Sequence, residues 1–225
     1  MAFFTPDFIQ FFQELRANNN RDWFNDNKKR YIAVVKEPFE QYIAAIIERA
    51  QIIDPDILIT PKDAIFRIYR DTRFSKDKTP YKLHASAAVA KGGRKDMVSP
   101  GIYMQFSDQV IEFYSGIYRP DSKQLQRIRE HIAVNLEAFE SLMNRPEFVT
   151  YFEGKIHGER NKRIPKEFVE IAERQDLIYQ KQFYYYHSLP ADTMLQDDLL
   201  DLTMAHFEAA RPMSQFFEAA LTNDE

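Results

Sequence analysis

The sequence contains no cysteine and only six glycines among its 225 residues. Without cysteine, the chain has no disulfide bond, no thiolate metal ligand and no cysteine nucleophile. Its one Gly-Gly pair, Gly92-Gly93, lacks the patterns of phosphate-binding and dinucleotide-binding loops. A G-x-S-x-G nucleophile elbow is also absent. The sequence therefore argues against nucleotide-fold enzymes and against hydrolases of that type.

Long apolar runs are missing as well. No stretch approaches the roughly 18 consecutive apolar residues that a membrane-spanning helix needs. The N-terminal residues lack the basic start, the apolar run and the small-residue cleavage site of a secretory signal. We therefore expect no membrane partner and a cytoplasmic location.

The histidines do not form a recognisable metal signature. They show neither a two-ligand spacing on one helix nor a glutamate at metalloprotease spacing. The five histidines are His84, His131, His157, His187 and His206. We predict no metal site and no cofactor. No other recognised catalytic signature occurs, so the sequence leaves open whether the protein is an enzyme.

The composition provides enough apolar material for a substantial core. Hydrophobic residues make up 44% of the chain and charged residues 28%, which is typical of a folded, soluble domain. The formal net charge of -4 gives no overall attraction to nucleic acid or to an anionic membrane. Because no repeat or linker interrupts the pattern, we predict a single domain over residues 1–225. The sequence predicts no oligomeric state.

Hydrophobic periodicity separates helical from sheet-rich regions. Apolar residues at three- and four-residue steps predict helices within residues 5–51, 122–152 and about 192–222. Alternation with a period of two predicts a sheet-rich region over 64–118 and a further strand at about 178–186. Turn signals between the strands favour an antiparallel meander. The predicted fold class is α+β, a mainly antiparallel sheet with helices from both ends of the chain packed on it.

Local chemistry predicts several element boundaries. Asn20 is expected to cap the second helix, and Pro38 to break or kink the helix that follows. Ser122 is expected to cap one long helix. Residues 65–69 are predicted to form a strand and residues 71–80 the loop that follows it.

Positive charge is concentrated in residues 67–82. These sixteen residues hold six cationic side chains and two carboxylates, a net charge of +4, so the rest of the chain has a net charge of -8. Two carboxylates cannot neutralise six cations, and the surplus makes an external anion attractive. The cationic residues, our candidate ligand-binding residues, are Arg67, Arg70, Arg73, Lys76, Lys78 and Lys82.

The first hypothesis is a site for binding, or catalysis on, a small ligand that bears phosphate or carboxylate. In an extended segment Arg67 and Arg70 point to opposite faces, because successive side chains alternate. A guanidinium remains charged, so an inward-facing one must be met by a carboxylate or by a bound anion. Arginine suits bidentate recognition of such anions, and lysine adds a point charge.

Four residues in and beside this segment are candidates for catalysis. They are Asp71, Asp77, Tyr81 and His84. Asp71 lies between two arginines and should remain ionised, which favours a base or an orienting role over that of a general acid. His84 would lie near a bound anion as an acid or base, although a lone histidine on a strand is more often only hydrogen-bonded.

Two other hypotheses remain open. In the second, Arg70 and Arg73 pair with carboxylates and lock the sheet of a structural or interaction protein. In the third, the chain is a nucleic-acid-binding module whose lysines contact phosphates while Tyr184-Tyr185-Tyr186 stack on bases. We rank the third lower because the acidic remainder of the chain repels a polyanion. The basic loop 155–166 is either solvated or part of the same anionic site.

The charged segment also contains a motif, R-x-x-R-D-x-R-F-x-x-D-K-x-x-Y. All eight of its positions are filled, by Arg67, Arg70, Asp71, Arg73, Phe74, Asp77, Lys78 and Tyr81. The pattern resembles the signature of a widespread bacterial family of conserved hypothetical proteins, a domain of unknown function. The N-terminal residues Asn18, Asn19, Arg21, Trp23 and Phe24 are similar to that family too. The resemblance implies that residues 67–81 act as one unit, and it implies no reaction.

Overall fold

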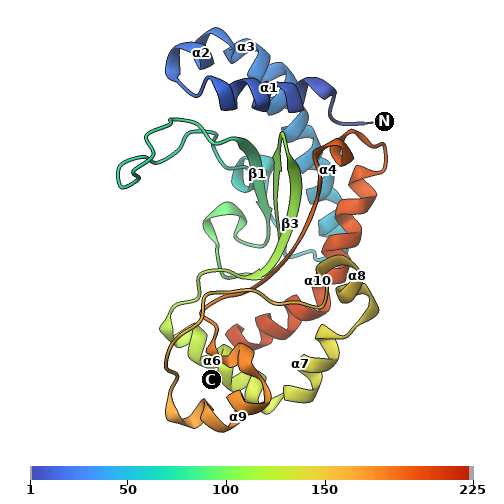
Figure 1. The fold of residues 1–225 in the computed structure, drawn as a ribbon. Helices are drawn as coiled ribbons and strands as arrows, with labels where there is room; N and C mark the ends of the chain where they lie inside the picture. Colours follow the sequence, from blue (N-terminus) through green and yellow to red (C-terminus); the bar gives the residue numbers. More distant parts are fainter. Residues whose placement is uncertain (1, 223–225) are drawn as a thin grey trace. The chain divides into compact units, whose positions relative to one another are not determined.

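The structure, a computed structural model, describes residues 2–222 and has an α+β fold (Figure 1). Four strands form one antiparallel sheet in the order β1-β2-β3-β4. Their bounds are β1 His84–Val89, β2 Ile102–Ser107, β3 Val110–Ile117 and β4 Phe183–Pro190. The predicted antiparallel meander is confirmed, and the late strand, β4, pairs with β3.

The last strand begins later than the predicted 178–186. A buried guanidinium explains the shift, because Arg129 donates to the carbonyl oxygens of Ile178 and Gln180, at 2.9 Å and 3.2 Å. Residues Asp176–Tyr179 form a 3₁₀ turn. Carbonyls held by a side chain do not enter a strand ladder, so β4 starts only at Phe183.

The chain divides into two compact units, which we describe separately. The first unit comprises Met1–Arg94, Tyr103–Phe113 and Ser188–Ala205, and the second comprises Lys95–Ile102, Tyr114–His187 and His206–Glu225. Strands β3 and β4 and the last helix, α10 (Leu199–Thr222), each contribute residues to both units. The expectation that residues 1–225 behave as a single domain stays a prediction.

The first unit is built from five helices, the start of α10 and part of the sheet. The helices are α1 Pro6–Ala17, α2 Arg21–Asp26, α3 Lys28–Tyr31, α4 Glu37–Ile53 and α5 Pro61–Ala64. The side chain of Asn20 accepts a hydrogen bond from the Trp23 N–H at 2.9 Å, so the predicted cap of α2 is confirmed.

The helical backbone continues through Pro38 instead of breaking there. Helical residues precede Pro38 as well as follow it, so its missing N–H removes one bond from a continuous helical run. The irregularity lies just before it, as a π-helical turn at Ile32–Lys36. An extra residue in the turn absorbs the hydrogen bond that proline cannot donate.

Aromatic side chains fill the core of the first unit. The ring centroids of neighbouring pairs lie 5.0–6.5 Å apart, mostly in edge-to-face or tilted contact. The residues are Phe4, Phe8, Phe39, Tyr42 and Phe106. They come from the N-terminal segment, α1, α4 and β2, so this packing holds the helices against one face of the sheet.

The second unit contains α6 Ser122–Val134, α7 Leu136–Met143, α8 Pro146–Phe152, α9 Val169–Arg174 and the end of α10. The expected single long helix is interrupted at Asn135, whose side chain donates to the His131 carbonyl at 3.0 Å and so ends α6. Its N-cap is Asp121, not Ser122, in a capping box with Gln124. No helix among the described residues is both long and apolar enough to cross a membrane.

Candidate functional site

Residues 65–87 form an irregular hairpin that leads into β1. Isolated bridges join Ile65 to Ala87 and Tyr69 to Tyr81, and the Arg70 N–H donates to the Pro80 carbonyl at 2.9 Å. Residues 65–69 therefore do not form the continuous strand that was predicted. They form isolated bridges with residues that follow in the same hairpin. Residues 70–80, which we call the arm, project from the fold between the two sides of this hairpin (Figure 1).

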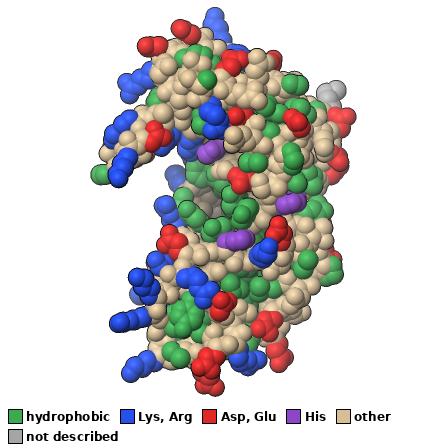
Figure 2. Space-filling view, in the orientation of Figure 1, with side chains coloured by type: hydrophobic (Ala, Val, Ile, Leu, Met, Phe, Trp, Pro, Cys, Tyr) green, Lys and Arg blue, Asp and Glu red, His purple; other side chains and the backbone are tan. Residues whose placement is uncertain are grey.

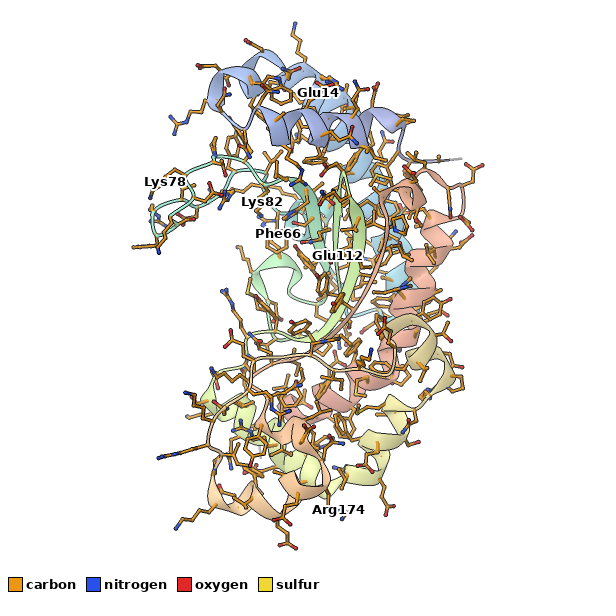
Figure 3. All side chains as sticks on the ribbon, viewed as in Figure 1. Glu14, Phe66, Lys78, Lys82, Glu112 and Arg174 are labelled. Carbon is orange, nitrogen blue, oxygen red and sulfur yellow. The ribbon has the colours of Figure 1, made fainter. Side chains whose placement is uncertain are left out.

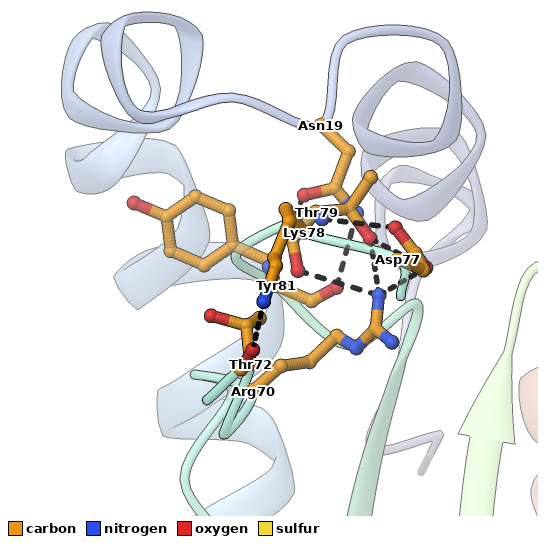
Figure 4. A network of polar contacts seen from close by, with 7 residues as sticks. All are labelled: Asn19, Arg70, Thr72, Asp77, Lys78, Thr79 and Tyr81. Carbon is orange, nitrogen blue, oxygen red and sulfur yellow. Dashed lines mark hydrogen bonds and ion pairs between the residues drawn. The ribbon is translucent and has the colours of Figure 1, made fainter. Parts of the chain in front are cut away.

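The first ion pair of the arm ties its two ends together. The guanidinium of Arg70 donates to the carboxylate of Asp77 and to the hydroxyl of Thr79 (Figure 4). Asp77 also accepts from the Thr79 backbone N–H at 2.9 Å. The Thr79 backbone bond and the Arg70 bond lower the pKa of Asp77 to about 2. Arg70 is thus met by a carboxylate of its own segment.

The second ion pair lies nearer the end of the arm. Arg73 donates from Nε and Nη2 to the two oxygens of Asp71, at 3.0 Å and 2.7 Å. This bidentate contact lowers the pKa of Asp71 to about 2. Lys78 donates to the Thr72 carbonyl at 2.8 Å. Both carboxylates of the charged segment are therefore engaged by its own arginines.

Tyr81 anchors the arm to the N-terminal helices. Its ring stacks on Phe24 at a centroid distance of 4.0 Å, and its backbone exchanges two hydrogen bonds with the side chain of Asn19, at 3.0 Å and 3.1 Å. Burial raises the pKa of the Tyr81 phenol. These contacts give Tyr81 a positioning role, and they explain why residues near 19–24 and residues 67–81 form one pattern in the sequence.

Two cations at the foot of the arm have no carboxylate partner. Within residues 2–222, neither Arg67 nor Lys82 forms an ion pair. The Lys82 ammonium lies 5.1 Å from the ring centroid of Phe66, and Figure 3 shows the two side chains at the start of β1. Burial and the nearby Arg67 guanidinium lower the pKa of Lys82. Lys82 is half-buried and Arg67 is exposed, so two like charges lie near each other at the edge of the fold.

His84 completes this group, which we call the base cluster: Arg67, Lys82 and His84. Burial, with a further contribution from the Lys82 charge, lowers the pKa of His84 to about 4, so its imidazole is neutral at pH 7. Its ring makes no hydrogen bond to another described residue. A half-buried imidazole without a partner, beside two unpaired cations, is a place where a ligand would supply the missing contacts.

The sequence analysis missed polar residues on the same side of the neighbouring strands. In β2 the side chains at 102, 104 and 106 are buried, while those at 103, 105 and 107 are half-buried. Tyr103 contacts Phe66 at 5.8 Å and donates to Gln105 at 3.1 Å, and Gln105 donates to Glu112 of β3. These residues could have been identified from the sequence, because polar residues alternate with apolar ones along the predicted strands.

The remaining predicted cations lie elsewhere on the arm or in the second unit. Lys76 is exposed on the arm. In the basic loop 155–166, Lys155 pairs with Glu153 at 2.6 Å and Arg160 with Asp176 at 2.6 Å. The other three cations of the loop, Lys162, Arg163 and Lys166, are exposed, as expected for a solvated segment.

The tyrosine run of β4 follows the alternation of a half-buried strand. Tyr185 is buried, and Tyr184 and Tyr186 are half-buried. Tyr186 stacks on Tyr114 with centroids 5.1 Å apart, and Tyr184 stacks on His157 at 5.9 Å. The rings thus already have aromatic partners within the second unit.

The described residues contain no group of three or more His, Cys, Asp or Glu side chains that could hold a metal ion. The comparison with curated proteins found no match. A family model described as conserved hypothetical protein, DUF2461, matches residues 7–216, which is nearly the whole chain and includes the arm and the base cluster. The chain therefore belongs to the DUF2461 family of conserved hypothetical proteins.

Proposed function

We propose that this protein binds a small anionic ligand, bearing phosphate or carboxylate, at the base cluster. The observation that supports the proposal is the pair of cations, Arg67 and Lys82, held together without a carboxylate partner among the described residues. Like charges at short range are unfavourable, and a bound anion would turn that repulsion into attraction. Lys82 is half-buried, so water screens its charge less than that of an exposed lysine, whereas Arg67 is exposed.

The arm narrows the choice of ligand-binding residues. Arg70 and Arg73 are already paired with Asp77 and Asp71, so an external anion would have to compete with those carboxylates. Lys76 and Lys78 have no carboxylate partner among the described residues either, but both are exposed on the arm. Arg67 and Lys82 form no ion pair there, and Arg67 acts on Asp71 only at longer range, where its charge helps to lower the pKa of that carboxyl. Of the six cations that the sequence offers, we therefore propose these two as the principal ligands, with Arg67 providing a planar fork and Lys82 a point charge.

His84 is the residue best suited to any proton transfer at this site. Asp71 and Asp77, with pKa values of about 2, are too acidic to donate a proton at neutral pH and are engaged by other groups. The His84 imidazole is neutral and unpartnered, so it can accept a proton as an anion binds beside it. A bound anion is expected to raise the pKa of His84 because it stabilises the imidazolium.

A structural ion-pair lock is the second candidate function, and the arm favours it. The Arg70–Asp77 and Arg73–Asp71 pairs brace residues 70–80 without any ligand. This reading accounts for four of the charged residues of the arm. It does not account for Arg67 and Lys82, which is why we place ligand binding first. Nucleic-acid binding ranks third, because the tyrosines of the second unit and two cations of its basic loop, Lys155 and Arg160, already have partners.

Isothermal titration with inorganic phosphate, and then with small carboxylates, tests the proposal. The wild type should bind phosphate, and Arg67→Gln and Lys82→Met should each weaken binding about tenfold or more, the loss expected for one charge-assisted contact. Arg73→Gln is the matched control, because it removes a cation that the arm already neutralises. No binding by the wild type at millimolar concentrations, or equal weakening by all three variants, would contradict the proposal.

A further inference from the structure

The arm ends in an exposed aromatic ring. Phe74 is 96% exposed, and its one close charged neighbour is the guanidinium of Arg73, 5.8 Å from the ring centroid. Figure 2 shows a hydrophobic side chain at the end of the projecting arm, among Lys and Arg side chains. An aromatic side chain that is almost wholly in water buries no apolar area on folding, so its ring is available to pack against a partner.

The arm is also braced by contacts within itself. Two ion pairs and the hydrogen bonds of Asp77 link its residues and favour the conformation that presents this ring. A preorganised loop loses little conformational entropy when it binds. After the arginines are paired, the arm keeps two further cations, Lys76 and Lys78, so its surface remains positive around Phe74.

The same unit carries a surface of complementary chemistry. The turn at residues 52–58, which we call the acidic turn, exposes Ile52 and Leu58 to 83% and 82%. Between them lie Asp54 and Asp56, whose carboxylates both approach the ammonium of Lys91, at 3.7 Å and 3.4 Å. Two carboxylates share one cation, so the acidic turn keeps a net negative charge beside its two apolar side chains.

We propose that the arm of one copy of this chain binds the acidic turn of a second copy. Phe74 would pack against Ile52 and Leu58, and Lys76 would lie toward Asp56. Within one copy these side chains stay exposed, so neither surface covers the other. A second copy offers an apolar contact and an opposite charge together, and the net negative charge outside the arm makes approach by the positive arm favourable. The inference does not depend on anion binding.

Sedimentation equilibrium from about 1 µM to about 1 mM protein tests this inference. The wild type should self-associate in this range, and Phe74→Ser and Leu58→Ser should each weaken association about 30-fold, as expected for loss of a central aromatic or apolar anchor. Val134→Ser is the matched control, because Val134 is an equally exposed apolar residue outside both surfaces. Circular dichroism verifies that every variant is folded.

Charge reversal supplies a second, independent readout. Lys76→Glu and Asp56→Lys should each weaken self-association, and an equimolar mixture of the two variants should associate again. In that mixture the arm of each variant can bind the acidic-turn segment of the other variant, where it meets a residue of opposite charge. A wild type that stays monomeric throughout the range, or association that Phe74→Ser leaves unchanged, would overturn the inference. Failure of the mixture to associate would overturn it as well.

Discussion

At the scale of single residues, ion pairing within the protein decides which charged groups are available to a ligand. Arg70 and Arg73 look like Arg67 in the sequence, yet carboxylates of the arm engage the first two and leave the third unpaired. The sequence identified all three as candidates but could not separate them, because the separation depends on how the arm folds back on itself. His84 was a weak candidate for the same reason, since its burial arises from the fold and not from its neighbours in sequence.

Burial of His84 predicts a pH dependence of stability. Its pKa is about 4 in the folded chain, below the usual value of 6.5, so between these values the unfolded state binds more protons. The free energy of unfolding should therefore fall as the pH decreases from about 6.5 to about 4, by up to about 3 kcal/mol from this residue alone.

Urea denaturation at pH 7 and pH 4.5 measures this contribution. His84→Gln should lose less stability than the wild type over that interval, because glutamine does not titrate. His131→Gln provides a comparison at a less strongly perturbed histidine. If the free energy of unfolding depended on pH equally in the wild type and in His84→Gln, the pKa of His84 would not be lowered in the folded chain.

At the scale of elements, hydrophobic periodicity predicted which regions are helical and which are sheet, and polar contacts decided where they end. The late start of β4 follows from the carbonyls that Arg129 holds, and the end of α6 from the side chain of Asn135. Neither effect leaves a periodic signal. Residues 65–69 were predicted as a strand because their side chains alternate, yet only isolated bridges form there.

The arm itself is an element whose ion pairs act locally. Asp77 is exposed, so removing its partner strands no buried charge, and Arg70→Met should loosen the arm while the rest of the chain stays folded. Hydrogen exchange should accelerate at the Thr79 amide, and the melting temperature should fall by a few degrees at most. A loss of cooperative folding in this variant would instead support the structural lock as the main role of the segment.

At the scale of the whole molecule, the α+β class and the antiparallel meander could be predicted because they depend on periodicity summed over many residues. The base cluster could be predicted only as part of a longer charged segment. Arg67 and Lys82 lie fifteen positions apart in the sequence and approach each other because the hairpin closes. Gln105 and Glu112 alternate with apolar residues of their strands, and that alternation does not show which polar side chains meet across the sheet. The overall net charge of -4 indicated no general attraction to nucleic acid or to an anionic membrane, so the expectation of an anionic ligand came only from the local charge of residues 67–82.

The most direct test of anion binding at the base cluster is an NMR titration of the His84 imidazole with and without sulfate. Sulfate is suitable because, unlike phosphate, it does not itself titrate near neutral pH. Binding beside the imidazole should raise the pKa of His84 from about 4 toward or above 6.5, and Arg67→Gln and Lys82→Met should abolish most of that rise. The account would be contradicted if saturating sulfate left the pKa of His84 unchanged in the wild type. It would also be contradicted if the pKa rose as much in both variants as in the wild type.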